Sequence, residues 1–170
     1  SDEWKMQYFL LLYLFSVMVF LIFNLPLALV KTRQIFLGDA GSMMFGVILI
    51  YALIELAERP VPVLRATCAP WIVGLPLLDM LAVILNRLRR RRSPTSPDRS
   101  HIHHVLTDLG LSKGRTLIVL IIVQTILVAI GLSAMMLSIP DWLMFWSMVP
   151  AIIVYISLVN YLSKKATVCN

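Results

Sequence analysis

The residues of this chain best suited to chemistry form two short polar segments. In the first, residues 36–42, Asp39 lies between Gly38 and Gly41 and is followed by Ser42. A carboxylate in such a turn can hold a divalent cation or meet a phosphate group, because glycine lets the backbone approach a ligand closely. A simpler interpretation is that Asp39 or Ser42 is only the N-cap of the helix that follows.

The second segment contains all three histidines of the chain, His101, His103 and His104. Apolar residues within residues 100–109 recur at helical spacing, which predicts a short amphipathic helix that ends at Gly110. On this helix we expect His101, His104 and Asp108 on the face opposite the apolar stripe, and His103 at one flank. Imidazoles grouped in this way can donate hydrogen bonds to phosphate oxygens or bind a metal, although their spacing matches no zinc motif. A solvated polar face is the simpler explanation.

Both segments belong to a chain with the composition of an integral membrane protein. Hydrophobic residues make up 59% of its 170 residues and charged residues 14%, and the mean hydropathy is +0.87. We therefore predict an all-α, polytopic membrane bundle, a single membrane domain over residues 1–170, because helices satisfy their own backbone hydrogen bonds in lipid. About five stretches are long enough to cross the membrane: residues 8–30, 40–57, 66–86, 116–138 and 142–162.

The basic residues predict the orientation of these spans. Twelve of the 15 lysines and arginines fall in residues 31–39, in the long loop of residues 87–115 and in the C-terminal tail. By the positive-inside rule this side is cytoplasmic, so the N-terminus lies outside and the C-terminus inside. Both polar segments are then on the cytoplasmic side.

Asp79 is the one acid predicted to lie well inside a span. It precedes Arg87 by eight residues, which places it about 12 Å deep along the helix, and acids within membrane spans are candidates for function. Pro76 predicts a kink and frees a backbone carbonyl, which would give Asp79 a local partner. Both a structural and a functional role are open for Asp79. For most of the arginines in residues 87–92, anchoring on anionic lipid headgroups is the simpler explanation.

Three segments taken together, residues 36–42, 76–79 and 96–104, resemble the polyprenyl-phosphate N-acetylhexosamine-1-phosphate transferases. The most similar branch makes undecaprenyl-diphospho-N-acetylglucosamine in bacteria. The resemblance covers essentially the whole chain, which is similar to the C-terminal half of a family member. The Asp-Asp pair and the loop of Asp-Gly repeats that the family carries earlier are not found in these residues. We therefore expect the isolated chain to have no transferase activity.

The resemblance implies transfer of N-acetylglucosamine-1-phosphate from UDP-N-acetylglucosamine to undecaprenyl phosphate, with release of UMP. This reaction starts surface glycans such as lipopolysaccharide at the bacterial inner membrane. By the same resemblance, Asp39 binds Mg²⁺ (or Mn²⁺) and the diphosphate, while Gly38, Gly41 and Ser42 shape the turn. The residues that would contact the nucleotide diphosphate are His101, His103, His104, Arg87 and, more weakly, Arg99.

Other readings remain open. The related branch that transfers phospho-N-acetylmuramoyl-pentapeptide typically has three consecutive histidines, whereas this chain interrupts them with Ile102. A non-catalytic truncated membrane protein, or a metal transporter using the histidines, belongs to a different class. Membrane lipids are expected partners, a homodimer is compatible with the sequence, and no nucleic-acid partner is expected.

Overall fold

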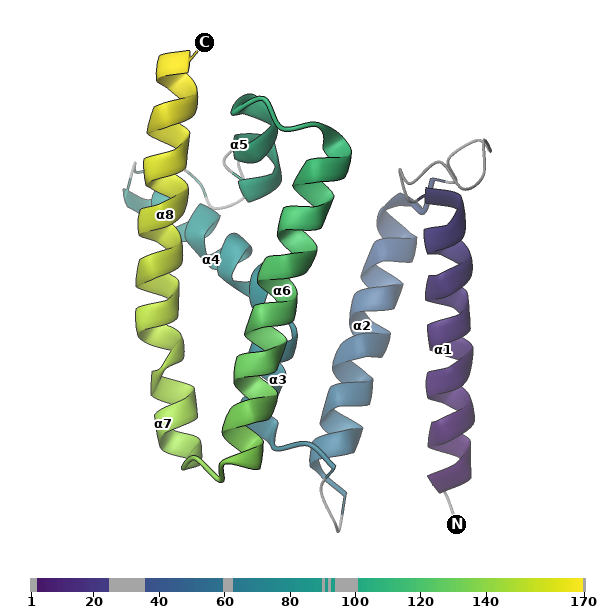
Figure 1. The fold of residues 1–170 in the computed structure, drawn as a ribbon. Helices are drawn as coiled ribbons and strands as arrows, with labels where there is room; N and C mark the ends of the chain where they lie inside the picture. The colour runs from purple at the N-terminus through teal and green to yellow at the C-terminus, as the bar shows by residue number, and fades with distance from the viewer. Residues whose placement is uncertain are drawn as a thin grey trace. The chain divides into compact units, whose positions relative to one another are not determined.

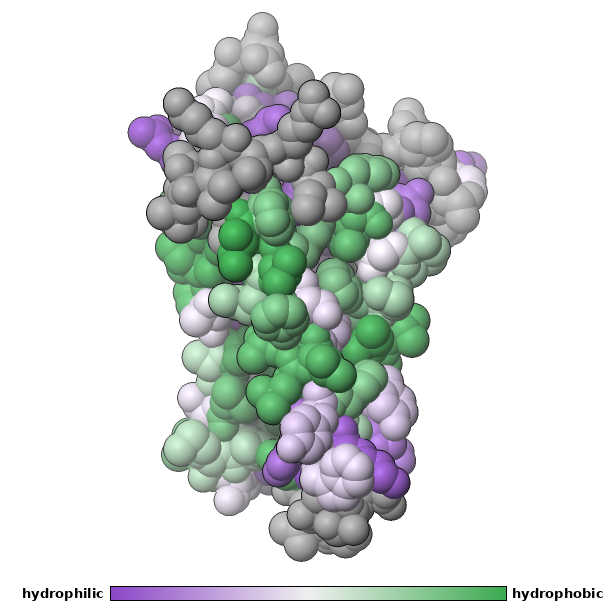
Figure 2. Space-filling view, turned by 90° about the vertical axis from the view of Figure 1, so that its right-hand side faces the viewer, coloured by the Kyte–Doolittle hydropathy of each residue, from purple (hydrophilic) through white to green (hydrophobic). Residues whose placement is uncertain are grey.

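The computed structural model describes residues 3–24, 36–59, 63–89, 91, 93 and 101–169, and these residues form helices and no strands. Within these described residues, four helices are long and apolar enough to cross a membrane, or five if one bent pair counts as a span. The chain is therefore a multi-pass membrane protein, as its composition predicts. Figure 2 shows one face, with apolar residues over its middle and hydrophilic residues towards its two ends. Packing divides the chain into two compact units, Ser1–Ala66 and Thr67–Asn170, which are described separately.

The first unit is a pair of helices, α1 (Glu3–Asn24) and α2 (Gly38–Ala57), which lie side by side (Figure 1). Edge-to-face aromatic pairs join them: the rings of Tyr13 and Phe45 are 5.7 Å apart at 82°, and the Tyr13 hydroxyl donates to the Phe45 carbonyl at 3.2 Å. The prediction of two spans here is confirmed. The first span begins five residues earlier than predicted, because the polar residues before Tyr8 are helix formers. The last part of this predicted span, residues 25–30, lies outside the described part of the chain.

The second unit is built around α6 (Lys113–Met136) and α8 (Met148–Cys169), with α4 (Gly74–Arg89) packed against both (Figure 1). The short α5 (Ile102–Asp108) lies on α6 and α8 at the end where α8 finishes. The predicted span of residues 142–162 is interrupted at Ser147, between α7 (Asp141–Trp146) and α8. Pro150 explains the interruption, because it has no N–H to donate to the Trp146 carbonyl and its ring crowds that carbonyl.

The predicted single helix over residues 66–86 is wrong. The chain forms a 3-10 turn, η1 (Ala66–Cys68), then α3 (Ala69–Ile72) and α4, and the two arms are bent by 74° at Val73. Pro76 is the physical cause, because it has no N–H for the Ile72 carbonyl and its ring crowds that carbonyl. The kink was predicted; its size was not.

Gln124, in the middle of α6, satisfies the backbone groups that this break leaves open. Its side-chain oxygen accepts from the Leu75 N–H at 2.9 Å, and its amide nitrogen donates to the Ile72 carbonyl at 2.7 Å. The carbonyl freed by Pro76 is therefore bonded to Gln124, and the expectation that it would serve Asp79 is wrong. Because lipid offers no substitute partner, this one amide makes the break tolerable inside a span.

Replacing Gln124 with methionine keeps the side-chain length and leaves both backbone groups without a partner. We expect the Gln124→Met variant to lower the free energy of unfolding by about 2 kcal/mol, because buried unsatisfied groups are destabilising. Reversible unfolding in mixed micelles measures this change.

Thr125→Val is the matched control, because the Thr125 hydroxyl is exposed and donates only to Ile121 of its own helix. A control variant that loses as much stability as Gln124→Met would contradict the assigned role of Gln124.

Candidate active site

The histidines lie on α5, and its local sequence explains why this helix forms and where it ends. Ile102, Val105 and Leu106 are buried in the core of the second unit, as the apolar stripe predicts. At the C-terminus Gly110 has a positive φ of 89° and its N–H donates to the Thr107 carbonyl at 2.9 Å. This end is the predicted glycine cap, which satisfies carbonyls that the helix leaves open.

The helix begins at Ile102, two residues later than predicted, and this changes the place of His101. His101 is the N-cap, with extended backbone angles of φ −64° and ψ 141°, and its own side chain makes no capping hydrogen bond. The expected face shared by His101 and His104 is therefore wrong. The reason is that the His101 ring is bonded to Asp79.

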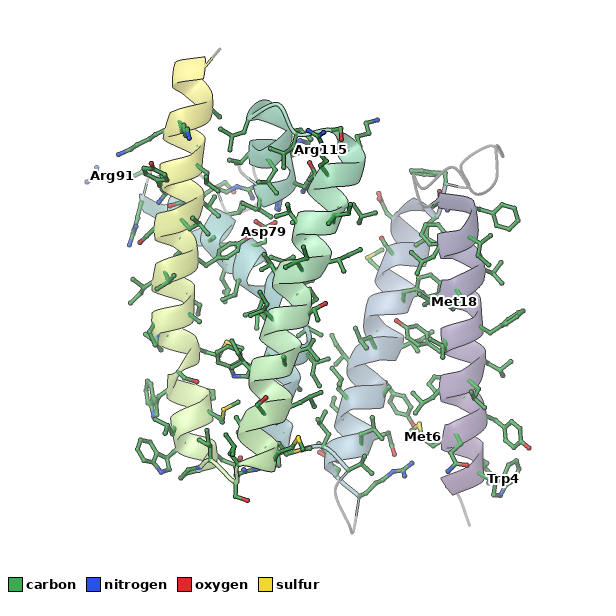
Figure 3. The ribbon with its side chains drawn as sticks, viewed as in Figure 1. Trp4, Met6, Met18, Asp79, Arg91 and Arg115 are labelled. Carbon is green, nitrogen blue, oxygen red and sulfur yellow. The ribbon has the colours of Figure 1, made fainter. Side chains whose placement is uncertain are left out.

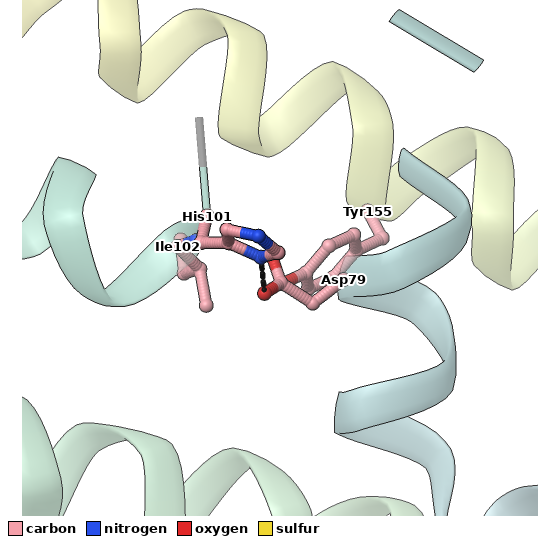
Figure 4. A network of polar contacts seen from close by, with 4 residues as sticks. All are labelled: Asp79, His101, Ile102 and Tyr155. Atoms are coloured by element: carbon pink, nitrogen blue, oxygen red, sulfur yellow. Dashed lines mark hydrogen bonds and ion pairs between the residues drawn. The ribbon is translucent and has the colours of Figure 1, made fainter. Parts of the chain in front are cut away.

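Asp79 of α4 joins three elements of the second unit (Figure 4). Its Oδ2 lies 2.9 Å from His101 Nδ1, and its Oδ1 accepts from the Ile102 backbone N–H at 3.0 Å. The Tyr155 hydroxyl, from α8, also donates to Oδ1 at 3.0 Å. Figure 3 shows Asp79 between α6 and α8, close to α5. Asp79 thus supplies the capping acceptor that the N-cap residue of α5 lacks.

The three imidazoles form one cluster, as the sequence predicts. The rings of His101 and His103 stack with centroids 5.8 Å apart at 23°, and those of His103 and His104 are 4.1 Å apart at 39°. The His101 and His104 side chains are half-buried, and His103 is exposed. Such a group offers several N–H donors to one ligand, and phosphate oxygens accept them.

The cluster changes the acid–base behaviour of His103. Desolvation of its ring, and then repulsion from His104 and His101, lower the pKa of His103 below its ordinary 6.5, against a weaker opposing effect of Asp79. His103 is therefore neutral over more of the physiological range than an isolated histidine. A bound anion would favour its protonated form.

The Asp39 turn belongs to the first unit, at the beginning of α2. The N-cap of α2 is Leu37 and no side chain caps the helix, so the interpretation of Asp39 or Ser42 as a cap is wrong. The Ser42 hydroxyl donates instead to the Asp39 backbone carbonyl at 2.9 Å. The Asp39 side chain is exposed, and within the described residues no hydrogen bond or ion pair is recorded for its carboxylate. Within the described part of the chain, these oxygens are therefore open to a ligand.

The two glycines of the turn have separate structural reasons. Gly38 has a φ of 70°, which a residue with a side chain adopts with strain. At Gly41 a Cβ atom would come within 2.7 Å of Leu37 Cγ, so this glycine makes room for the Leu37 side chain. Gly38 thus allows the backbone angle at the beginning of α2, and Gly41 allows the close approach of the Leu37 side chain.

Of the two candidate arginines, Arg87 is half-buried in the last turn of α4, two turns beyond Asp79. Arg99 lies outside the described residues. Within the described part of the chain, no three histidine, cysteine, aspartate or glutamate side chains are grouped so that they could hold a metal ion.

Sequence reasoning missed Tyr155, and it left the role of Asp79 open. Tyr155 is buried and lies 76 residues from Asp79 in the sequence. The sequence feature that could have pointed to Tyr155 is its hydroxyl group, because a hydroxyl inside a membrane span needs a hydrogen-bond partner.

Comparison with known proteins identifies the family. The model of glycosyl transferase family 4 matches residues 1–57, which include the Asp39 turn. Undecaprenyl-phosphate alpha-N-acetylglucosaminyl 1-phosphate transferases are similar over 152 residues: 32% identical in Yersinia pestis and 31% in Escherichia coli strain K12. Both matches cover 89% of this chain. The chain belongs to glycosyl transferase family 4.

A third family 4 relative, the enzyme of the same name from Haemophilus influenzae, is 31% identical over 130 residues, or 76% of this chain. The chain spans about 40% of the length of the first two relatives and 37% of the third. No solved structure matches the chain.

The lowered pKa of His103 is open to direct measurement by histidine ring NMR over a pH series. We expect the titration midpoint of His103 to lie below 6.5. At a pH between this midpoint and 6.5, the folded state then binds fewer protons than the unfolded state. Stability from this group then rises as pH rises through the window between the two pKa values, and falls as pH falls through it.

The His104→Gln variant removes one repelling charge, and we expect it to move the His103 midpoint back towards its ordinary value. A wild-type midpoint at or above 6.5 would contradict the lowered pKa of His103, and no change in the variant would contradict the contribution of His104 to it.

Proposed function

We propose that this chain is part of a transferase that moves N-acetylglucosamine-1-phosphate from UDP-N-acetylglucosamine to undecaprenyl phosphate, releasing UMP. The observation that carries the proposal is the cluster of three imidazoles at one end of the second unit, in which His101 is bonded to the partly buried acid Asp79. The relatives are named undecaprenyl-phosphate alpha-N-acetylglucosaminyl 1-phosphate transferases, and this name supports the same lipid acceptor and the same transferred group.

The proposed chemistry suits the residues present. A phosphate oxygen of the lipid attacks the β-phosphorus of the UDP-sugar, and the bond to the UMP oxygen breaks. This transfer needs positioning and neutralisation of negative charge more than a protein nucleophile. His101, His103 and His104 donate hydrogen bonds to the diphosphate, and Arg87 adds positive charge. Arg99 stays a candidate for the same ligand.

Asp39 fits a Mg²⁺ (or Mn²⁺) ion bound together with the diphosphate. Magnesium is held in enzymes by one or two carboxylates, with substrate phosphates and water completing its shell. Asp39 offers an exposed carboxylate without a described protein partner, which suits this use. When bound, the ion would neutralise charge on the phosphate oxygens.

We place both segments on the cytoplasmic side of a bacterial inner membrane, where UDP-sugars are available. The basic residues of the predicted loops support this orientation through the positive-inside rule. The product would initiate a surface glycan such as lipopolysaccharide. A homodimer remains a prediction.

The reaction is tested by giving the full-length gene product, in membranes with undecaprenyl phosphate, each of two UDP-sugars. We expect UMP release with UDP-N-acetylglucosamine and none with UDP-N-acetylmuramoyl-pentapeptide. Activity only with the pentapeptide substrate would overturn the proposal in favour of the related branch. We expect the isolated 170-residue chain to release no UMP.

The role of Asp39 gives a prediction for the same assay. Asp39→Asn keeps the shape of the turn and removes the charge, so we expect turnover to fall by about 10²-fold or more and its dependence on Mg²⁺ concentration to weaken.

Glu58→Gln, at the opposite end of α2, is the matched control and should retain wild-type turnover. An Asp39→Asn variant as active as this control would exclude Asp39 from binding the metal.

A further inference from the structure

We propose that Asp79 is a positioning residue that fixes the tautomer and orientation of His101, so that His101 presents Nε2 to the phosphate group bound at the histidine cluster. The identity of that phosphate rests on the proposed function. The control of His101 by Asp79 rests on the contacts of the second unit alone.

The hydrogen bonds at the Asp79 carboxylate define the tautomer of His101. Oδ1 accepts from the Ile102 N–H and from the Tyr155 hydroxyl, both at 3.0 Å. Because Oδ1 already accepts these two hydrogen bonds, the oxygen that faces His101 Nδ1 is Oδ2, at 2.9 Å, and it acts as an acceptor. Nδ1 therefore carries a proton, and Nε2 is the ring nitrogen left for a ligand. Nε2 donates to a phosphate oxygen when it carries a proton as well, in the imidazolium form of the ring.

Burial gives the pair a direction. The Asp79 side chain is 14% exposed and that of His101 is 37% exposed, so the acid lies inward and the imidazole outward. Because Nδ1 faces the buried acid, the opposite edge of the ring, with Nε2, is directed away from it. A carboxylate behind an imidazole in this way holds the ring in one tautomer and supports a positive charge on it.

A cap alone would not need an aspartate. An asparagine at position 79 can still accept from the Ile102 N–H and the Tyr155 hydroxyl through its Oδ1. The asparagine Nδ2, however, is a donor at the place where the aspartate Oδ2 is an acceptor. It would therefore donate to His101 Nδ1, which requires that this ring nitrogen carry no proton. The Asp79→Asn variant therefore separates control of the tautomer from support of α5.

Nitrogen NMR of the histidine rings in the 170-residue chain, in lipid nanodiscs, reads the tautomer directly, and His101→Gln assigns the signal. We expect protonated Nδ1 in the wild type and a switch to protonated Nε2 in Asp79→Asn. A matched control is Asn160→Ala, which breaks an amide pair with Asn86 between the same helices, α4 and α8, and should leave the tautomer unchanged. An unchanged His101 signal in Asp79→Asn, or bare Nδ1 in the wild type, would overturn the proposal.

Kinetics of the full-length gene product test the consequence for the reaction. We expect Asp79→Asn to lower turnover by about 10²-fold, while its thermal midpoint moves no more than that of Asn160→Ala. If Asp79 acts through His101, combining Asp79→Asn with His101→Gln lowers turnover no further than His101→Gln alone.

Losses that multiply in the double variant would mean that Asp79 acts independently of His101, which contradicts the proposal. Absence of transfer in the wild-type gene product would instead refute the proposed function. In that case the tautomer experiment still decides whether Asp79 controls His101.

Discussion

A carboxylate inside a membrane protein needs hydrogen-bond donors from the protein. In the second unit, the donors to Asp79 of α4 come from α5 and α8, and these hydrogen bonds connect the three helices. Its donors come from three places: the N-cap of α5, the first residue of α5, and Tyr155 of α8. Leaving such a group without partners would be strongly unfavourable in a low-dielectric environment. The position of the histidine helix is therefore tied to an acid on α4.

The two acids singled out from the sequence differ in how their oxygens are used. Asp79 is largely buried and both of its oxygens are engaged by the protein. Asp39 is exposed, and no described residue is recorded as bonding to its carboxylate. A carboxylate whose oxygens are both hydrogen-bonded within the protein is suited to positioning other groups. A carboxylate without such bonds is suited to binding a cation or substrate. This contrast supports the separate roles that we propose for them.

Much of this arrangement follows from local sequence. Long apolar runs predict the spans, and the periodicity up to Gly110 predicts α5 and its buried stripe, because these signals depend on neighbouring residues. The bend at Val73 was foreseen only as a kink at Pro76. The backbone groups left open at the bend are bonded to Gln124, which lies 49 residues from Leu75. The place of His101 likewise depends on Asp79 and Tyr155, and such distant pairings leave no trace in local spacing.

The central claim is that His101 Nε2, oriented by Asp79, meets a phosphate of the nucleotide substrate. An experimental structure of the full-length gene product with UDP-N-acetylglucosamine bound tests it most directly, through the distance from His101 Nε2 to the nearest diphosphate oxygen. We expect a charge-assisted hydrogen bond of about 2.7–2.9 Å, with the contact between His101 Nδ1 and Asp79 retained. A diphosphate bound away from the histidine cluster, or a His101 ring turned away from Asp79, would contradict it.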